Sequence, residues 1–537
     1  MKLIANLSNV DSQTTLQAGI SPQQLMEAAG QQVAKAVKTH TQATQRGIIV
    51  CGPGNNGGDG FVCARKLYEA GYTKLTVIYT GTNYRNEALE NLEKLLMGLP
   101  IEILPAAQKP QQAINRIGEA EFIVDALFGS GLSRNIEGTE AQLIEAINAR
   151  QAQAHCWVLA VDIPSGVHSE SGAILGVAVQ AAQTVTFAVG KPGLYLYPGK
   201  GYAGVITVAD IGIPPRFIEE EPSPYQLIET ADARQWLPYR HHDSHKYHYG
   251  HVLVIAGSQA MPGAAILCAE AAASGGAGLV TLASMPGVFS QVPCRAEIMR
   301  LHLPDAHELG ADSIAPIQAA LANGRYNAIL IGPGLGRAPE TIATVQALLS
   351  HFKTLHLPVI VDADALSALA DQPIALSEQF ILTPHVGECA RLLHWENATV
   401  SANLPQAAQE ARERYKATVV LKSAATLVAT HTQASSEPSG AASESQPLQS
   451  IWISPTGNAG MATAGSGDVL SGIIGALAAQ KQAQQQPIWQ AAPLGVYVHG
   501  CAGDSAAQHR TVYAMRASDI TQHIPDAFQT ILQQPKQ

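Results

Sequence analysis

The sequence predicts an α/β protein of two domains, each built on a mostly parallel sheet with helices on both faces. Short β-branched runs alternate with amphipathic stretches along the chain, which is typical of such sheets. The 537 residues exceed what one hydrophobic core usually supports. A segment rich in proline, acidic residues and histidine, from 213 to 249, has no clean period. We therefore expect a first domain over residues 1–215, a linker over 216–249 and a second domain over 250–535.

The expected strands form two separate series. In the first domain they are GIIVC (47–51), LTVIYT (75–80), FIVDALF (122–128), WVLAVDIP (157–164), TVTFAV (184–189) and GVITVADIG (204–212). In the second they are HVLVIAG (251–257), GLVTLAS (278–284), NAILIGPG (327–334), PVIVDADA (358–365), FILTPHVGE (380–388) and TVVLKSAATLVAT (418–430). Residues 431–450 are rich in Ser, Gln and Ala and predict a flexible loop. The glutamine-rich end from Gln533 is expected to fray.

Composition excludes several classes of function. The net charge is -10 and basic residues are not clustered, which argues against a nucleic-acid binder. The most apolar region, 251–284, is interrupted by Pro262, Glu270 and glycines, so we expect no membrane span. The first residues lack the apolar run of a signal peptide. The 7 cysteines are scattered without zinc spacing, which favours reduced thiols and a cytoplasmic location.

The stretch NAGMATAGSGDVLSG, residues 458–472, is the most informative part of the chain. Gly465, Ser466 and Gly467 precede an apolar run that predicts a helix, and backbone amides at a helix N-terminus bind anions. Asp468 stands in the first turn, where a carboxylate could take a proton from an acceptor hydroxyl during phosphoryl transfer. The alternative is a glycine-rich cap with an ordinary acidic first turn.

A second polar site is expected in the first domain, at the carboxyl edge of its sheet. The strand GIIVC runs into GPGNNGGDG, whose glycines match a dinucleotide fingerprint, but no acidic residue ends the next strand to hold a ribose. Asp125 and Asp162 end two further strands, so they should lie in the same crevice. Each could instead cap the following helix.

These motifs together resemble one family. GPGNNGGDG, VDALFGSGL and VDIPSG are similar to the epimerase domain of the bifunctional NAD(P)H-hydrate repair enzymes, and GISPQQLMEAAG resembles its leading helix. MPGAA, IGPGLG, VDADAL, LTPHVGE and NAGMATAGSGDVLSG resemble the matching dehydratase domain. The resemblance implies a Rossmann-like first domain and a ribokinase-like second domain. It implies epimerisation of the R and S forms of NADHX and NADPHX, and dehydration of the S form with conversion of ADP to AMP and phosphate.

The resemblance also implies roles for residues of the first domain. Asp162 would be the acid or base, and potassium would be held by Asn56, Asp125 and Ser165. The hydrate would contact Asn55, Asn56, Gly57, Gly58, Asp59, Gly129, Ser130, Gly131, Leu132, Ser133, Arg134, Asn135 and Asp162. The opening LIANLSNVD departs from the family's pattern, so we expect the first helix to pack differently.

In the second domain Asp468 would be the base, with Gly465, Ser466 and Gly467 as the anion hole. Ala265, Gly334, His385 and Asp468 would bind the hydrate, and Lys422, Ser423, Ala424, Ala425, Thr426 and Gly467 would bind the nucleotide. Ser423 replaces the glycine usual in the family, which matters if that position needs a positive φ. Mg²⁺ is expected with ADP. We expect small-molecule substrates only and a homo-oligomer.

An alternative function stays open at this point. The GSGD motif also occurs in ribokinase-like vitamin and sugar kinases, and the first domain could be a noncatalytic nucleotide-binding module. The pairing of LTPHVGE with NAGMATAGSGD favours the dehydratase over the kinase.

Overall fold

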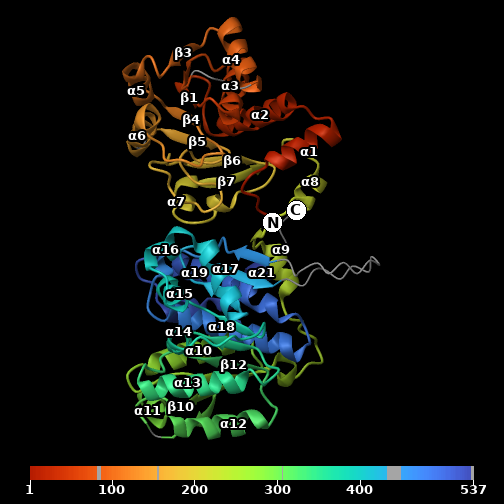
Figure 1. Cartoon of the computed structure of the whole chain (residues 1–537), viewed down its shortest axis with the longest axis vertical. Coiled ribbons are helices and arrows are strands. Elements are labelled where there is room, and N and C mark those ends of the chain that lie inside the picture. Colours follow the sequence, from red (N-terminus) through yellow and green to blue (C-terminus); the bar gives the residue numbers. More distant parts are fainter. Residues whose placement is uncertain (82–85, 154–155, 305, 432–448, 534–537) are drawn as a thin grey trace. The chain divides into compact units, whose positions relative to one another are not determined.

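The chain folds into two compact units. The structure, a computed structural model, describes residues 1–81, 86–153, 156–304, 306–431 and 449–533. The N-terminal unit is Lys2–Tyr225, and the C-terminal unit is Gln226–Gln537 together with Met1 (Figure 1). Nearly all of the loop predicted over 431–450, and the glutamine-rich tail from 534, lie outside the described residues. Every helix among the described residues is too short or too polar to cross a membrane.

The N-terminal unit contains a seven-stranded sheet in the order β3-β2-β1-β4-β5-β6-β7, in which all neighbouring strands are parallel. The strands are β1 (Gly47–Cys51), β2 (Leu75–Tyr79), β3 (Glu102–Pro105), β4 (Phe122–Ala126), β5 (Trp157–Val161), β6 (Gln183–Phe187) and β7 (Val205–Ala209). The helices are α1 (Ser8–Ala18), α2 (Pro22–His40), α3 (Asn55–Glu69), α4 (Asn86–Gly98), α5 (Pro110–Gly118), α6 (Gly138–Ala152), η1 (Pro192–Leu194), α7 (Gly199–Ala203) and α8 (Pro215–Glu220).

Alternating residues of the central strands face two separate cores. Ile49, Val77 and Val124 pack with apolar residues of α2, α3 and α4, whereas Ile48 and Ile123 pack with those of α5 and α6. Because successive side chains of a strand point to opposite faces, this division places helices on both faces of the sheet. The predicted doubly wound arrangement of the first domain is confirmed.

Helices α1 and α2 pack beside the sheet of the N-terminal unit. A capping box between Ser21 and Gln24 begins α2. Val10 of α1 packs with Leu25 of α2 and Phe217 of α8 in a third, smaller core. The polar face of α1 is therefore left to line the space above the sheet, which becomes important for the site described below.

The C-terminal unit contains a ten-stranded sheet in the order β11-β10-β9-β12-β13-β14-β15-β16-β17-β8. Strands from β11 to β15 are parallel, and β16 is antiparallel to both of its neighbours. The strands are β8 (Tyr225–Leu227), β9 (His251–Ile255), β10 (Leu279–Ser284), β11 (Met299–His302), β12 (Ala328–Ile331), β13 (Val359–Val361), β14 (Phe380–Leu382), β15 (Thr418–Leu421), β16 (Leu427–His431) and β17 (Gln449–Ile453). The tyrosine that begins β8 belongs to the N-terminal unit, and the rest of the strand to this one.

Helices α10 and α18 pack closely together and both contact β9. The helices of the unit are α9 (Thr230–Trp236), η2 (Lys246–Tyr249), α10 (Pro262–Ser274), α11 (Pro286–Gln291), η3 (Ala311–Ser313), α12 (Ile314–Ala322), α13 (Pro339–Phe352), α14 (Asp364–Asp371), α15 (Val386–Leu393), α16 (Asn397–Ala402), α17 (Leu404–Tyr415), η4 (Ala459–Met461), α18 (Ser466–Ala483), η5 (Ile488–Gln490), α19 (Ala491–Arg510), α20 (Ala517–Gln522) and α21 (Ile524–Leu532). The segment expected as a linker, 216–249, thus contains most of α8 and all of β8, α9 and η2, and the unit boundary passes through β8.

The tryptophans are unevenly distributed. In the C-terminal unit Trp236, Trp452 and Trp489 form a cluster, with ring centroids 4.9 Å, 5.7 Å and 6.1 Å apart in the three pairs. In the N-terminal unit Trp157 stacks on His40 at 4.7 Å.

Twelve predicted strand segments correspond to observed strands, with one correction. The segment 418–430, expected as one strand, is a hairpin of β15 and β16 joined by the turn Lys422–Thr426. The sequence did not predict β3, β8, β11 and β17, all of which lie at or next to a sheet edge.

Candidate active sites

The glycine-rich loop after β1 is shaped by close backbone contacts. A Cβ added to Gly52 would lie 1.8 Å from the carbonyl oxygen of Leu127, and one on Gly57 would lie 1.9 Å from the carbonyl oxygen of Gly52. Neither position can therefore take a side chain without moving the backbone. The contact holds the loop before α3 against the loop that follows β4 and brings both to one edge of the sheet.

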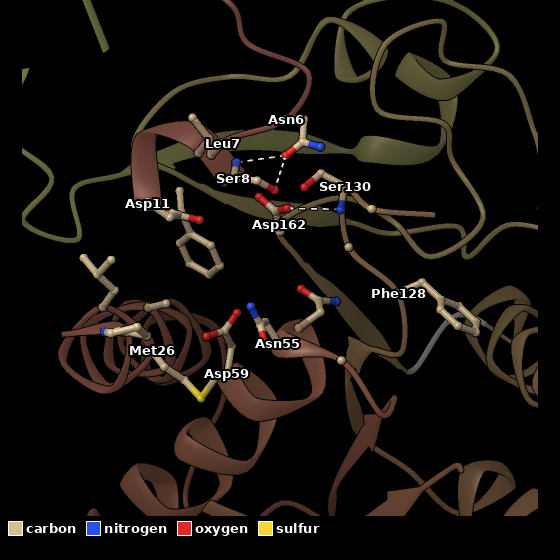
Figure 2. A pocket seen from close by; sticks show the side chains of 18 of the residues that line it. Asn6, Leu7, Ser8, Asp11, Met26, Asn55, Asp59, Phe128, Ser130 and Asp162 are labelled. Carbon is tan, nitrogen blue, oxygen red and sulfur yellow. Dashed lines mark hydrogen bonds between the residues drawn. The ribbon is translucent and has the colours of Figure 1, made fainter. Parts of the chain in front are cut away.

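At this edge the N-terminal unit has a cavity of about 1300 Å³ (Figure 2). Its walls come from α1, the start of α3, the loop after β4 and the residues following β5 and β6. The predicted residues that line it are Asn55, Asn56, Asp59, Gly129, Ser130, Gly131, Leu132, Ser133, Arg134 and Asp162. Gly57, Gly58 and Asn135 are not among the lining residues. The predicted crevice at the carboxyl edge is thus present.

Asp162 has an unusual backbone conformation and a buried cationic partner. Its φ is 65°, in the left-handed region that non-glycine residues rarely adopt. The Nζ of Lys191, whose side chain is 1% exposed, lies 2.5 Å from one carboxylate oxygen of Asp162. That oxygen also accepts a hydrogen bond from Thr186 at 3.2 Å, and the amide of Ser130 donates to the other at 3.4 Å. The carboxylate is thus fixed at the cavity wall with its charge compensated.

Lys191 was not predicted from the sequence. It follows β6, 29 positions after Asp162, in a GKPG segment that contains no recognisable catalytic pattern. The helix α1 was also missed: Asn6, Leu7, Ser8, Asp11, Ser12, Thr15 and Leu16 line the cavity. The spacing of Ser8, Asp11, Ser12 and Thr15 is that of one helix face and could have indicated a polar surface.

Asp11 and Asp59 share the cavity with Asp162. Burial, opposed by Lys191 and reinforced by Asp162, raises the pKa of Asp11 to about 6. Burial, with the negative charges of Asp162 and Asp11, raises the pKa of Asp59 well above its usual range. A single ammonium group cannot balance three carboxylates, so protons are retained in this cluster near neutral pH.

Of the three predicted cation ligands, Asn56 lines the cavity, whereas Asp125 and Ser165 lie behind its wall. Burial raises the pKa of Asp125 to about 6, although bonds from Ser165 and the Leu127 amide oppose the shift. The amide and hydroxyl of Ser165 donate to Asp125 at 2.9 Å and 2.6 Å. The buried side-chain amide of Asn56 has no hydrogen-bond partner among the described residues. Because an orphaned buried oxygen is costly, this donor set of oxygens fits a hard cation.

In the C-terminal unit, α18 begins as predicted at the GSGD motif. Gly465 precedes the helix with a φ of 88°. The amide of Ser466 donates to the carbonyl of Thr463 at 3.3 Å, whereas the amides of Gly465 and Gly467 have no backbone partner among the described residues. A Cβ on Gly467 would lie 3.2 Å from the Nζ of Lys422. A helix N-terminus and a lysine ammonium group therefore meet at one point, as an anion site requires.

Lys422 is held by two carboxylates. Its Nζ lies 2.7 Å from Asp362 and 3.9 Å from Glu388. The other oxygen of Asp362 accepts from Ser471 of α18 at 2.5 Å. Burial lowers the pKa of Lys422, but the charges of Asp362 and Glu388 outweigh it and leave the pKa raised.

Asp468 lies in the same acidic surroundings. Burial, with the charge of Asp362, raises its pKa to about 7, and Lys422 opposes this shift. A carboxylate with such a pKa is able to accept a proton near neutral pH.

The predicted hydrate-binding residues are only partly exposed. His385 caps α15, its Nδ1 accepting from the amides of Gly387 and Glu388, and its side chain is 55% exposed. Burial and the charge of Lys422 lower the pKa of His385. A Cβ on Gly334 would lie 2.9 Å from that of Ala264, whereas the side chain of Ala265 is fully buried.

The turn Lys422–Thr426 accommodates its serine. Ser423 is absent from the residues with positive φ, and its hydroxyl donates to the carbonyl of Ala425 at 2.7 Å. The replacement of glycine therefore causes no left-handed strain here.

Comparison with known proteins gives a consistent result. A family model described as NAD(P)H-hydrate dehydratase matches residues 252–526, and one described as YjeF-related protein N-terminus matches residues 22–193. The bifunctional NAD(P)H-hydrate repair enzyme Nnr of Moorella thermoacetica is 40% identical over 513 residues, covering 93% of this chain and 91% of that protein. The enzyme of the same name from Escherichia coli is 32% identical, covering 94% and 88%.

Solved structures resemble the second domain. The ADP/ATP-dependent NAD(P)H-hydrate dehydratase of Bacillus subtilis, crystallised with ATP and Mg²⁺, is 27% identical, with a TM-score of 0.46, and the match covers 56% of this chain and 97% of that one. A ribokinase-like superfamily protein of Enterococcus faecalis is 25% identical, with a TM-score of 0.46, covering 58% and 99%.

Proposed function

The chain belongs to the family of bifunctional NAD(P)H-hydrate repair enzymes, and we propose that its two units divide the repair between them. The N-terminal, Rossmann-like unit interconverts the R and S forms of NADHX and NADPHX. The C-terminal, ribokinase-like unit dehydrates the S form to NADH or NADPH while ADP is converted to AMP and phosphate. The relatives support this function and not the vitamin or sugar kinase alternative.

One observation supports the dehydratase most directly: Asp468, with a pKa near 7, stands at a helix N-terminus beside the ammonium of Lys422. Asp468 takes the proton of the C6 hydroxyl as that oxygen attacks the terminal phosphoryl group. Lys422 and the amides of Gly465 and Gly467 stabilise the charge on the transferred group. The C6 oxygen then leaves as phosphate while the electron pair of the ring nitrogen forms an N1=C6 double bond. Loss of a proton from C5 forms the C5=C6 double bond of the product, and N1 recovers its pair.

The remaining dehydratase residues bind and orient in this proposal. Gly334 and His385, with the backbone near Ala265, hold the hydrate, and the turn Lys422–Thr426 with Gly467 holds the nucleotide. Glu388 and Asp364 are hard oxygen donors of the kind that Mg²⁺ takes. The ion neutralises charge on the phosphate oxygens when it is bound.

In the N-terminal unit we assign Asp162 to proton exchange at the C6 hydroxyl of the hydrate, with Lys191 compensating its charge. The amides and side chains of residues 55–59 and 129–135 hold the substrate. Asn56, Asp125 and Ser165 hold potassium, which would fix the loop after β4 to the start of α3. The orphaned amide of Asn56 supports this assignment.

We also propose a cytoplasmic location and small-molecule partners for the enzyme. All seven cysteines are free thiols, five of them buried, which suits a reducing cytoplasm. The partners are NADHX, NADPHX and ADP, with no nucleic acid or membrane, and we expect a homo-oligomer.

The test uses the purified full chain and mixed R,S-NADHX, with ADP, with ATP or with no nucleotide. The absorbance of reduced nicotinamide is followed over time. Complete recovery of NADH that depends on ADP is the expected result, since the epimerase converts the R form into the S form that the dehydratase uses. Recovery that stops at the S fraction would remove the epimerase from the proposal. No recovery with either nucleotide would overturn the repair function.

A further inference from the structure

We propose that Asp11, on the N-terminal helix α1, is a second proton-transferring residue of the epimerase site and works together with Asp162. The inference rests on the proposed epimerase function and deepens it. Asp11 lines the same cavity as Asp162, and Figure 2 shows the carboxyl groups of Asp11, Asp59 and Asp162 pointing into one space from three different elements.

The chemistry of epimerisation requires two proton-transferring groups. To invert C6, the hydroxyl must leave from one face of the ring and water must add to the other. A proton donor is needed where the hydroxyl leaves, and an acceptor is needed where water enters. A carboxylate fixed as firmly as Asp162, by Lys191, Thr186 and Ser130, reaches one face only.

The surroundings of the three carboxyl groups divide the roles among them. Asp162 has the ammonium of Lys191 at 2.5 Å, which compensates a negative charge on its carboxylate. Asp59 is more deeply buried, and burial with the charges of Asp162 and Asp11 raises its pKa well above its usual range. Asp11 is only partly buried, and its pKa of about 6 lets it give up and regain a proton near neutral pH. Different environments can move the pKa values of neighbouring carboxyl groups apart, and this separation gives the groups their acid and base roles.

The geometry of α1 supports the same role. The face that includes Ser8, Asp11, Ser12 and Thr15 lines the cavity. The hydroxyls of Ser12 and Thr15 donate to backbone carbonyls of their own helix, at 2.8 Å and 3.1 Å. The carboxyl group of Asp11 makes no hydrogen bond to another described residue, so it remains available to a ligand in the cavity.

Epimerisation proceeds by the loss of one water from C6 and the addition of another. The proton of Asp11 passes to the departing C6 hydroxyl, the C6–O bond breaks with its electron pair on oxygen, and water leaves. The lone pair of N1 forms the double bond to C6. A second water adds its oxygen to the other face of C6, N1 recovers its pair, and the water's proton goes to Asp162. Asp162 then releases that proton to solvent, and Asp11 takes up another.

Several charged groups surround Asp11 and contribute to any pH dependence. The described ones that line the cavity are Asp59, Glu87, Arg134, Asp162 and Lys191, and α8, which packs against α1, contributes Arg216, Glu219 and Glu220. Of these, Asp162 and Lys191 act most directly on Asp11. A single apparent pKa near 6 therefore belongs to the cluster, with Asp11 as its most accessible member.

The experiment compares Asp11→Asn and Asp11→Glu with wild type in the full chain, using purified R-NADHX without nucleotide so that only epimerisation proceeds. Gln17→Ala, at an exposed position of the same helix outside the cavity lining, is the control. Asp11→Asn should lower kcat about 10²- to 10³-fold with little change in KM. Asp11→Glu should recover part of the loss, and Gln17→Ala should stay within about threefold of wild type. Dehydration of S-NADHX with ADP, in the other unit, should be unchanged in all variants.

Two further measurements distinguish proton transfer from a structural role. The epimerisation rate of wild type should fall as pH rises above about 6, and this alkaline limb should disappear in Asp11→Asn. In water labelled with heavy oxygen, wild type should place one labelled atom in each S-NADHX formed. Retention of the original oxygen, or an Asp11→Asn kcat within threefold of wild type, would overturn the inference. A wild-type chain that fails to interconvert the epimers would instead overturn the proposed function on which it rests.

Discussion

Asp468 lies among carboxylates that keep its pKa close to 7, and the proposed dehydratase should therefore depend on pH. As the base it must be unprotonated, so kcat/KM should rise as pH increases through about 7 and then level off. Asp468→Asn should lower kcat about 10²- to 10⁴-fold and abolish this rise. The measurement is the rate of NADH formation from S-NADHX and ADP across the pH range.

The same Asp468→Asn protein provides its own control, because epimerisation without nucleotide depends on the other unit and should be unaffected. A variant that keeps more than a tenth of the wild-type kcat would show that another group takes the proton.

At single residues, the sequence predicted side chains that follow strands better than those that arrive from elsewhere. Asp162 and Asp125 lie at the predicted edge because strand ends of a parallel sheet share one edge, although only Asp162 lines the cavity. Lys191 and Asp11 were not predicted, because no local sequence pattern links them to Asp162. They come close to Asp162 only through the packing of α1 and of the loop after β6. At Ser423 the sequence raised a concern that the structure removes, because this residue does not have the positive φ that would strain a serine.

Among the elements, the start of α3 depends on a glycine that no other residue can replace. Gly57→Ala would drive a Cβ to 1.9 Å from the carbonyl oxygen of Gly52, and backbone on both sides would have to move. We expect a loss of about 3 kcal/mol in unfolding free energy, at the upper end of overpacking effects, together with the loss of epimerase activity. Urea denaturation of the full chain measures the change.

The matched control is Gly131→Ala, in the loop after β4, where an added Cβ meets nothing within 4 Å. Its unfolding free energy should stay within about 0.5 kcal/mol of wild type. Equal losses from both substitutions would contradict the close-contact explanation.

The C-terminal end of α18 contains a buried lysine that has no acidic partner among the described residues. Lys481 bonds Gln490 at 2.8 Å and Gln486 at 3.4 Å, and burial lowers its pKa to about 8. Between pH 8 and 10.5 the unfolded chain binds more protons, so the stability contributed here rises with pH; below pH 8 the burial cost is fully present.

Lys481→Met should therefore raise the unfolding free energy at pH 7 by about 2 kcal/mol, after allowing for the lost hydrogen bonds. The gain should shrink as pH rises towards 10.5. Denaturant unfolding at several pH values checks this, with the exposed Lys353→Met as the control. A gain that is independent of pH would show that packing, and not charge, is responsible.

The prediction of strands succeeded where both faces are buried. β1, β4, β9 and β12 are fully buried and mostly apolar, and their positions were recognised directly. The missed strand β11 has only exposed or half-exposed residues, because it lies at the edge of its sheet. β11 is a strand because it pairs with β10, and the local pattern of apolar residues in the sequence cannot predict that pairing.

At the scale of the whole molecule, the two compact units should respond separately to ligand. ADP at about 100 times its dissociation constant stabilises its binding unit by about 2.7 kcal/mol. In calorimetry of the full chain, only the transition of the C-terminal unit should move to higher temperature. Sodium chloride at matched ionic strength is the control, and an equal shift of both transitions would contradict separate unfolding.

The placement of the tryptophans supplies an optical label for each unit. The electronic transitions of close, mutually inclined indoles such as Trp236, Trp452 and Trp489 are coupled. The folded C-terminal unit should therefore give an exciton signal in circular dichroism, and this signal should vanish when the unit melts. Trp157, the single indole of the N-terminal unit, stacks on an imidazole and contributes no such couplet. Spectroscopy of the unlabelled protein can therefore assign each melting step to its unit.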